Sequence, residues 1–195
     1  MEHNNFLAIS PIDGRYYNKT HHLSGYFSEF GLTKYRLKIE IKYLLYLIRL
    51  NLDSEFASLE EAQKKAILNI YLNFNTTDFD RIKSLEYECS HDVKALEYFI
   101  KDKLIKLNCM FLVPFIHFGL TSQDINNCAI TSSIKDFIYK IYNPHLQNII
   151  SLINIKAKAW KEIRMLAHTH GQPAVPTTLG KEFRVYSYRL EKQLK

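Results

Sequence analysis

The sequence contains few of the residues that interrupt or cross-link a chain: six glycines, five prolines and three cysteines among 195 residues. Most of the glycines and prolines lie in three short patches, so the long segments between them are predicted to be regular secondary structure. Cys89, Cys109 and Cys128 are widely spaced and form no CxxC pair. This spacing argues against a disulfide framework and against a zinc site, and it predicts three small buried hydrophobic side chains.

Long apolar runs and blocks of like charge are also missing. The longest apolar run, YLLYLI at residues 43–48, is far too short to span a bilayer, and the N-terminus MEHNNFLA lacks the order of a signal peptide. These features predict a cytoplasmic protein that does not interact with membranes. The net charge is +6, but the basic residues are scattered singly, which favours small anionic ligands over nucleic acid.

Apolar residues recur at spacings of three and four in four segments, the pattern of amphipathic helices. The stripes run from Leu32 to Leu50, from Val93 to Leu107, from Ile130 to Trp160 and from Leu179 to Leu194. The third belongs to a segment that begins near Ser122 and contains Pro144, which is expected to kink or split the helix. The pattern therefore predicts a helical protein.

Two features bear on domain organisation. A boundary is expected near residues 108–114, where one apolar stripe ends and CMFLVPFIHFG shows no clear period. The last stripe stops at Lys195 without the Gly, Asn or Pro that normally ends a helix. Either the chain is cut or its C-terminal helix frays, and the pattern alone favours neither reading.

Polar residues of the kinds used in active sites concentrate in four irregular patches. The first is SPIDGRYY at residues 10–17, where a turn at Pro11 and Asp13 would present Arg15 and Tyr16 outward. A guanidinium in this place could bind carboxylate or phosphate. The alternative is an ordinary turn with a surface arginine.

The second patch is CSHDVK at residues 89–94. Ser90 is expected to be the N-cap of the helix that begins near Val93, and Asp92 suits the positive first turn. His91 would then lie beside a helix N-terminus, where free amides disfavour a protonated imidazole and attract an anionic ligand. The alternative is a histidine with a structural role.

The third patch is HFGLTSQDINN at residues 117–127. Thr121 or Ser122 is expected to cap the following helix, and the two hydroxyls with free backbone amides could hold a carboxylate or phosphate. A plain N-cap explains one hydroxyl but not both. Asn126 and Asn127 are poor choices early in a helix, which indicates that something other than helix propensity placed them there.

The fourth patch is LAHTHGQPAVPTTLGKEF at residues 166–183. Gly171, Pro173 and Pro176 exclude a regular helix and a central strand. In an extended segment His168 and His170 would point to the same face, so that one could be oriented by its neighbours while the other meets a ligand. The alternative is a pair of histidines on a surface loop.

Taken together, the patches resemble a known family. TSQDINN at 121–127 and THGQPAVPTTLGKE at 169–182 resemble the first two signature regions of the fumarase/aspartase superfamily of helical lyases. SPIDGRYYNK at 10–19, SHDVKALEYFIKDKL at 90–104 and FIHFGLTSQDINN at 115–127 are similar to the adenylosuccinate lyases in particular. The order and spacing of the motifs agree, and the resemblance covers nearly the whole chain.

The resemblance implies an all-α fold, with an N-terminal helical domain at residues 1–110 and the start of a central helical bundle at residues 111–195. It implies a C–N lyase of purine nucleotide biosynthesis that removes fumarate by β-elimination. The substrates would be adenylosuccinate, which gives AMP, and succinyl-aminoimidazole-carboxamide ribotide. The family further implies a homotetramer that needs no metal or organic cofactor.

The resemblance also implies roles for individual residues. His170 would be the general acid for the leaving nitrogen, and His91 would assist near the same site. His117 resembles a phosphate contact, and His168 is either a support residue or a bystander. The residues expected to bind the succinyl nucleotide are Arg15, Tyr16, Ser90, Asp92, Thr121 and Ser122, with the last two on a succinyl carboxylate.

One departure from the family matters. Its third signature, a loop with SSxMPxKxNP that supplies the serine base, occurs nowhere in these 195 residues. The chain is therefore expected to be truncated, inactive alone and prone to self-association. The alternatives are another lyase of the superfamily, such as argininosuccinate lyase or fumarase, which would not share SPIDGRYY, or a helical nucleotide-binding or interaction module that has kept the scaffold.

Overall fold

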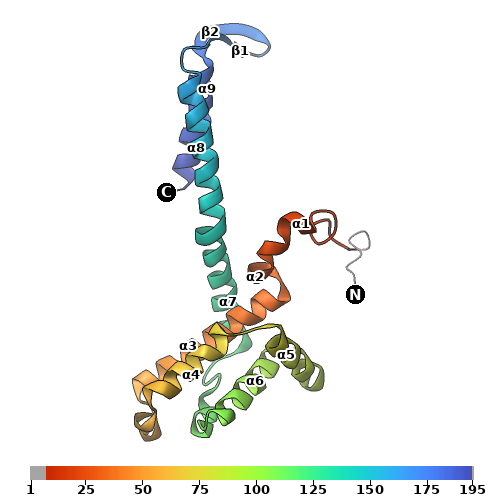
Figure 1. The fold of residues 1–195 in the computed structure, drawn as a ribbon, viewed down its shortest axis with the longest axis vertical. Coiled ribbons are helices and arrows are strands. Elements are labelled where there is room, and N and C mark those ends of the chain that lie inside the picture. The colour runs from red at the N-terminus through yellow and green to blue at the C-terminus, as the bar shows by residue number, and fades with distance from the viewer. Residues whose placement is uncertain (1–7, 195) are drawn as a thin grey trace. The chain divides into compact units, whose positions relative to one another are not determined.

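The computed structural model describes residues 8–194 (Figure 1). The chain divides into two compact units, Met1–Ile134 and Lys135–Lys195. The helices confirm the all-α fold class, to which the structure adds one small sheet of two strands. The domain boundary expected near residue 110 was implied by the domains of the family fold, and it stays a prediction.

The first unit is built from helices and short helical turns. Its elements are α1 (Tyr17–Thr20), η1 (His21–Leu23), α2 (Ser24–Phe27), α3 (Glu29–Leu50), η2 (Ser54–Ser58), α4 (Glu61–Leu72), α5 (Thr76–Cys89), α6 (Asp92–Lys106), η3 (Met110–Phe115) and most of α7 (Ser122–Phe137). The apolar stripes that begin at Leu32 and Val93 correctly predicted α3 and α6. The patterns of α4 and α5 were not recognised.

The core of the first unit lies between α3, α4, α5 and α6. Nearly every third or fourth side chain of α3 is buried there, and the fully buried residues include Leu37, Ile41, Ile67, Leu96, Phe99 and Leu104. Burying an aliphatic or aromatic side chain of this size contributes about 1.5–3 kcal/mol. The ends of α3 are set locally, because the Ser28 hydroxyl accepts from the Gly31 amide and Asn51 ends the helix in the left-handed conformation.

The three cysteines differ in exposure. Cys109 is buried, as predicted, whereas Cys89 is only partly buried and Cys128 is exposed. The prediction of three buried cysteines was therefore wrong for Cys128, which lies on the solvent side of α7 between the buried Ile125 and Ala129.

The second unit contains the end of α7, a π-helical turn at Ile138–Tyr142, α8 (Asn143–Ala159), β1 (Arg164–Thr169), β2 (Gln172–Thr178) and α9 (Leu179–Gln193). The interruption expected at Pro144 is present as the π-helical turn that precedes it. Pro144 itself lies in the first turn of α8, directly after this π-helical turn. The apolar stripe that begins at Leu179 correctly predicted α9.

Helices α8 and α9 lie side by side (Figure 1). Their contact includes an edge-to-face pair of Trp160 and Phe183, with ring centroids 4.9 Å apart. Gly180 is buried at the contact, and its amide donates to the Trp160 carbonyl at 3.0 Å. A Cβ on this glycine would lie 2.3 Å from the carbonyl oxygen of Ala157, so the close approach of the two helices depends on the missing side chain.

Strands β1 and β2 form an antiparallel hairpin, which was not predicted. Thr169 pairs with Gln172, so His170 and Gly171 are the two turn residues, and both have positive φ (52° and 73°). Positive φ at both positions is the geometry of a type I′ turn. The hairpin has only edge strands, which explains how β2 tolerates two prolines.

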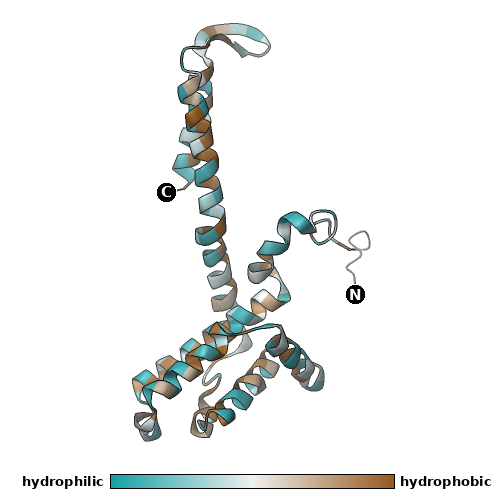
Figure 2. Cartoon of the chain, viewed as in Figure 1, coloured by the Kyte–Doolittle hydropathy of each residue, from teal (hydrophilic) through white to brown (hydrophobic). Residues whose placement is uncertain are grey.

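Polar and apolar residues alternate around the helices of both units (Figure 2). Within the described residues, no helix is both long enough and apolar enough to cross a bilayer. Several large apolar side chains of α8 are nevertheless exposed, among them Ile149, Leu152 and Ile155, with exposed fractions of 50–62%.

Candidate active site

Three polar residues of α3 hold the second and third patches together. Arg36, Glu40 and Tyr43 are four and three residues apart, so they lie on one face of the helix. Each makes a contact with a residue that is distant in sequence, as described below. None of the three was predicted as a site residue, because Arg36 and Glu40 lie between the apolar residues of this segment and Tyr43 was counted among them.

Arg36 bridges the starts of α6 and α7. One guanidinium nitrogen, Nη2, lies 2.8 Å from Oδ2 of Asp92, and Nε donates to Oδ1 of Asn126 at 2.7 Å. The side chain of Arg36 is largely buried, with an exposed fraction of 12%. This contact accounts for Asn126, whose poor helix propensity had indicated another role.

His91, and not Ser90, is the N-cap of α6. Ser90 has φ +54° and ends α5 in the left-handed conformation, so its side chain is not placed to cap the next helix. Nδ1 of His91 accepts from the Lys94 amide at 3.1 Å. The prediction of Ser90 as N-cap was therefore wrong by one residue. An Nδ1 that accepts a hydrogen bond carries no proton, which leaves Nε2 of His91 as the nitrogen that can donate.

Asp92 is an ionised group at the start of α6. Burial alone would raise its pKa, but the hydrogen bond from the Val93 amide and the charge of Arg36 outweigh burial, and the pKa lies below its usual value. The carboxylate is 44% exposed and already paired with Arg36. It is therefore suited to orienting a cationic or hydrogen-bonding neighbour, and less suited to direct contact with an anionic ligand.

Thr121 is the residue that caps α7. The Asp124 carboxylate accepts from both the backbone amide and the hydroxyl of Thr121, at 2.7 and 2.9 Å. These two hydrogen bonds lower the pKa of Asp124. The Thr121 hydroxyl is thus engaged within the chain, whereas Ser122, which is partly exposed, takes no part in this pair.

His117 lies in the loop before α7 and is bound to α3. Its Nδ1 lies 2.5 Å from Oε1 of Glu40, and Tyr43 donates to the Phe118 carbonyl at 2.9 Å. His117 has φ +56°, and Gly119 has φ +69°, so the loop turns through two left-handed residues. The polar face of α3 therefore fixes the loop at two consecutive positions.

Arg15 and Tyr16 lie on a turn near the start of the described chain. The Gly14 amide donates to the Ser10 carbonyl at 3.0 Å, and the Tyr16 amide to the Pro11 carbonyl at 2.9 Å. Both predicted ligand-binding side chains are exposed, as expected from the sequence. The guanidinium of Arg15 lies 5.6 Å from the ring centroid of Tyr16, so the two side chains present a joint surface.

His168 and His170 belong to the second unit. His168 lies in β1, and His170 is the first residue of the hairpin turn. Side chains alternate between two faces only within the extended strand, and β1 ends at Thr169. The prediction that both histidines share one face was therefore wrong. Both side chains are exposed, and the turn holds His170 on a fixed, non-helical bend. Whether His170 and His91 act at one site stays a prediction.

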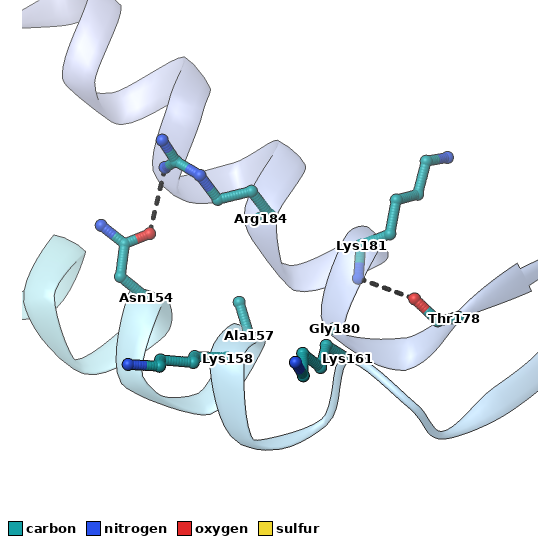
Figure 3. Close-up of a pocket in the computed structure, with 8 residues that line it drawn as sticks. All are labelled: Asn154, Ala157, Lys158, Lys161, Thr178, Gly180, Lys181 and Arg184. Atoms are coloured by element: carbon teal, nitrogen blue, oxygen red, sulfur yellow. Dashed lines mark hydrogen bonds between the residues drawn. The ribbon is translucent and has the colours of Figure 1, made fainter.

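A hollow of about 480 Å³ lies where α8 meets α9 (Figure 3). It is lined by the cationic side chains Lys158, Lys161, Lys181 and Arg184, together with Asn154, Ala157, Thr178 and Gly180. Arg184 pairs with Glu191 at 2.9 Å, and Lys181 pairs with Glu182 at 3.0 Å. Part of the positive charge is therefore already neutralised. Among residues 8–194, no group of three or more His, Cys, Asp or Glu side chains could hold a metal ion.

Comparisons with known proteins agree with the motifs. The family described as Lyase matches residues 14–195. The adenylosuccinate lyase of Dictyostelium discoideum is 49% identical over 98% of this chain and 42% of its own length. That of Legionella pneumophila (strain Corby) is 44% identical over 95% of this chain and 41% of its own length. The chain thus spans less than half the length of these curated relatives.

Solved structures show the same fold at low sequence identity. The β-carboxy-cis,cis-muconate cycloisomerase of Acinetobacter calcoaceticus is 19% identical and superposes with a TM-score of 0.65, covering 89% of this chain and 39% of that one. The family match extends over nearly the whole chain, and both curated relatives are named adenylosuccinate lyase. The chain therefore belongs to the lyase family.

Proposed function

We propose that these residues form the substrate-binding and acid part of an adenylosuccinate lyase site. The observation that supports this most directly is the 49% identity with the Dictyostelium discoideum enzyme over 98% of the chain. The substrates would be adenylosuccinate and succinyl-aminoimidazole-carboxamide ribotide. The full enzyme would be a cytoplasmic homotetramer, as the family resemblance implies.

The proposed reaction is a β-elimination that releases fumarate. A base removes a proton beside one carboxylate, the negative charge spreads onto that carboxylate, and an acid protonates the departing nitrogen. His170 is the proposed acid, because an imidazole can donate a proton near neutral pH and the hairpin turn fixes its backbone. His91 is proposed to assist through Nε2, since its Nδ1 is occupied by the α6 cap.

The substrate carries two carboxylates and a phosphate, so electrostatic stabilisation is the main demand on the site. Thr121 and Ser122 at the N-terminus of α7 are proposed to bind a succinyl carboxylate, and Ser90 and Asp92 at the start of α6 are proposed to line the same pocket. Helix N-termini favour anions. Arg15 and Tyr16 are proposed to bind the nucleotide from their exposed turn.

The base is proposed to come from a segment outside these 195 residues, because the serine motif SSxMPxKxNP does not occur in them. The chain alone should then bind nucleotide without turning it over. A chimera that joins residues 1–195 to the remaining part of the Dictyostelium discoideum enzyme should convert adenylosuccinate to AMP and fumarate. Absorbance of the substrate follows the reaction.

The acid role is tested in this chimera by His170→Asn, which removes the titratable group and keeps a polar side chain. We expect kcat to fall by roughly 10²- to 10⁴-fold, the usual effect of removing a general acid. His168→Asn, two residues away in β1, is the matched control and should retain most activity. Unchanged turnover in His170→Asn would exclude the proposed acid.

A second candidate function is a nucleotide-binding module without catalysis, and the missing serine motif favours it. The same chimera distinguishes the lyase from the nucleotide-binding module. An inactive chimera that still binds AMP would support the binding module. An active one would support the lyase.

A further inference from the structure

Glu40 is an unusual residue for the middle of a core helix. Its exposed fraction is 2%, and it lies beside Ile41, which is fully buried. In the part of the chain that the structure describes, the other buried polar side chains are the uncharged Thr33, Ser133 and Ser187. Burial raises the pKa of Glu40, as expected for a carboxyl removed from water. A buried carboxyl is costly unless it is paired.

The pairing of Glu40 is directed at one residue, His117. Oε1 lies 2.5 Å from the ring Nδ1, and the hydrogen bond and the charge of His117 both act to lower the pKa of the carboxyl against the effect of burial. An ionised carboxyl only accepts hydrogen bonds, so it matches a ring nitrogen that carries a proton. This arrangement favours a proton on Nδ1. Nε2 is then the ring nitrogen that can face a ligand.

The loop geometry adds a second constraint. His117 has φ +56°, a conformation that is unfavourable for a residue with a side chain and persists only when its surroundings enforce it. Glu40 holds the ring, and Tyr43, one turn along α3, holds the next carbonyl, that of Phe118. The His117 side chain is 12% exposed. It is therefore fixed in place and still partly accessible.

We propose that Glu40 is a positioning residue, which accepts a hydrogen bond from Nδ1 of His117 and fixes the orientation of the ring, so that Nε2, which carries a proton in the imidazolium form, donates to the nucleotide phosphate. The proposal rests on the proposed function, in which His117 contacts that phosphate. With Nδ1–H directed to Glu40 and Nε2–H to the phosphate, the imidazolium charge lies between two anions. The buried carboxylate of Glu40 thereby supports the positive ring of His117, and that ring binds the negatively charged phosphate.

Two other carboxylates interact electrostatically with this pair, one with Glu40 and one with His117. Glu97 of α6 raises the pKa of Glu40 through charge repulsion, and the charge of His117 contributes to lowering the pKa of Asp124 at the start of α7. Glu97 is bound to Lys94 at 2.6 Å and makes no hydrogen bond to His117 in the described structure. Glu97→Gln is therefore a matched control, because it removes a nearby charge and keeps the Glu40–His117 bond.

The first test needs no catalysis and uses the 195-residue chain. Nitrogen NMR of ¹⁵N-histidine-labelled protein distinguishes a protonated from an unprotonated Nδ1. We expect a protonated Nδ1 for His117 in the parent chain and in Glu97→Gln, and an averaged tautomer signal in Glu40→Gln. Circular dichroism checks that each variant is folded. An unprotonated Nδ1 in the parent chain, or the same signal in Glu40→Gln, would overturn the positioning.

The second test is kinetic and uses the active chimera. Loss of a charge-assisted hydrogen bond at His117 should raise KM for adenylosuccinate about tenfold in Glu40→Gln, and kcat should change far less. The increase should vanish for the same substrate without its phosphate. It should also vanish in the His117→Asn background, where the positioned ring is absent.

The two tests separate the possible failures. A chimera that is inactive with the native sequence contradicts the proposed function, and the NMR result on the isolated chain still decides whether Glu40 fixes the ring. An active chimera in which Glu40→Gln moves the NMR signal but leaves KM unchanged overturns the role in phosphate binding. A KM effect that persists without the phosphate does the same.

Discussion

At the scale of residues, the candidate site depends on side chains that lie outside its motifs. Arg36 and Glu40 of α3 bind Asp92, Asn126 and His117, which belong to the predicted patches. The motif residues thus receive their orientation from one helix. Substitutions in that helix should disturb stability and ligand binding together.

Arg36→Met keeps the aliphatic stem and removes the guanidinium. We expect it to destabilise the first unit by about 1 kcal/mol, because Asp92 is nearly half exposed and solvent screens part of the ion pair. Urea denaturation followed by circular dichroism measures the change. Arg49→Met, at an exposed position in the last turn of the same helix, is the control and should be almost neutral. Equal effects of both would contradict the bridging role.

The raised pKa of Glu40 predicts a pH dependence of stability. A carboxyl whose pKa is higher in the folded than in the unfolded state adds stability below the unfolded value, near 4.5, and loses that contribution as pH rises through the folded pKa. Glu40→Gln removes this dependence, while His117 and Glu97, which face Glu40, are unchanged. The stability of the variant relative to the parent should therefore increase with pH. Urea titrations between pH 4 and 7 test this, and a constant difference would contradict it.

Sequence patterns identified some site residues and not others. Thr121 followed from the capping rule as one of two possible caps, because its interaction with Asp124 is local in sequence. The choice of Ser90 as N-cap failed because Ser90 is needed to end α5, which the apolar pattern had not revealed. Glu40 could not be assigned a role, since its partner lies 77 residues away.

At the scale of elements, the sequence predicted the helices with clear apolar stripes. Helix α5 was missed because its composition is more polar than that of α3 or α6, and only Ile82 and Leu85 are buried on it. The hairpin was missed because two prolines argued against a strand. A strand with a free edge accepts proline, and the pair His170-Gly171 supplies the two positive φ values of the turn.

The contact between α8 and α9 should be sensitive to Gly180. In Gly180→Ala the added Cβ would meet the backbone of Ala157 and Lys161 at 2.3–2.7 Å, so the helices must separate. We expect a loss of about 1–3 kcal/mol in the stability of the second unit, the usual cost of overpacking. Thermal unfolding measures it. Gly25→Ala, where a Cβ meets nothing within 4 Å, is the control, and an equal loss in both would contradict the packing argument.

At the scale of the whole molecule, the chain spans less than half the length of its curated relatives and exposes large apolar side chains. Leu152 and Ile155 of α8 are 62% and 59% exposed. Adjacent apolar side chains of this kind commonly mark a surface that another protein surface covers. Self-association was expected from the sequence, whereas the exposed side chains on α8 followed from the structure.

We expect the 195-residue chain to self-associate, with an apparent mass that rises with concentration in size-exclusion chromatography with light scattering. The double variant Leu152→Glu and Ile155→Glu should lower that mass without unfolding the helix, since both side chains are already exposed. Ile150→Glu, at a position only 7% exposed, should instead unfold the second unit. A monomeric parent chain at all concentrations would contradict the expectation.

The packing of Trp160 against Phe183 has a practical consequence. The sequence contains one tryptophan, and it lies in the second unit. Its fluorescence emission is therefore a built-in probe for that unit, whereas far-ultraviolet dichroism averages over all helices. If the two signals change at different temperatures, the units unfold separately; coincident transitions would mean that the chain behaves as one cooperative body.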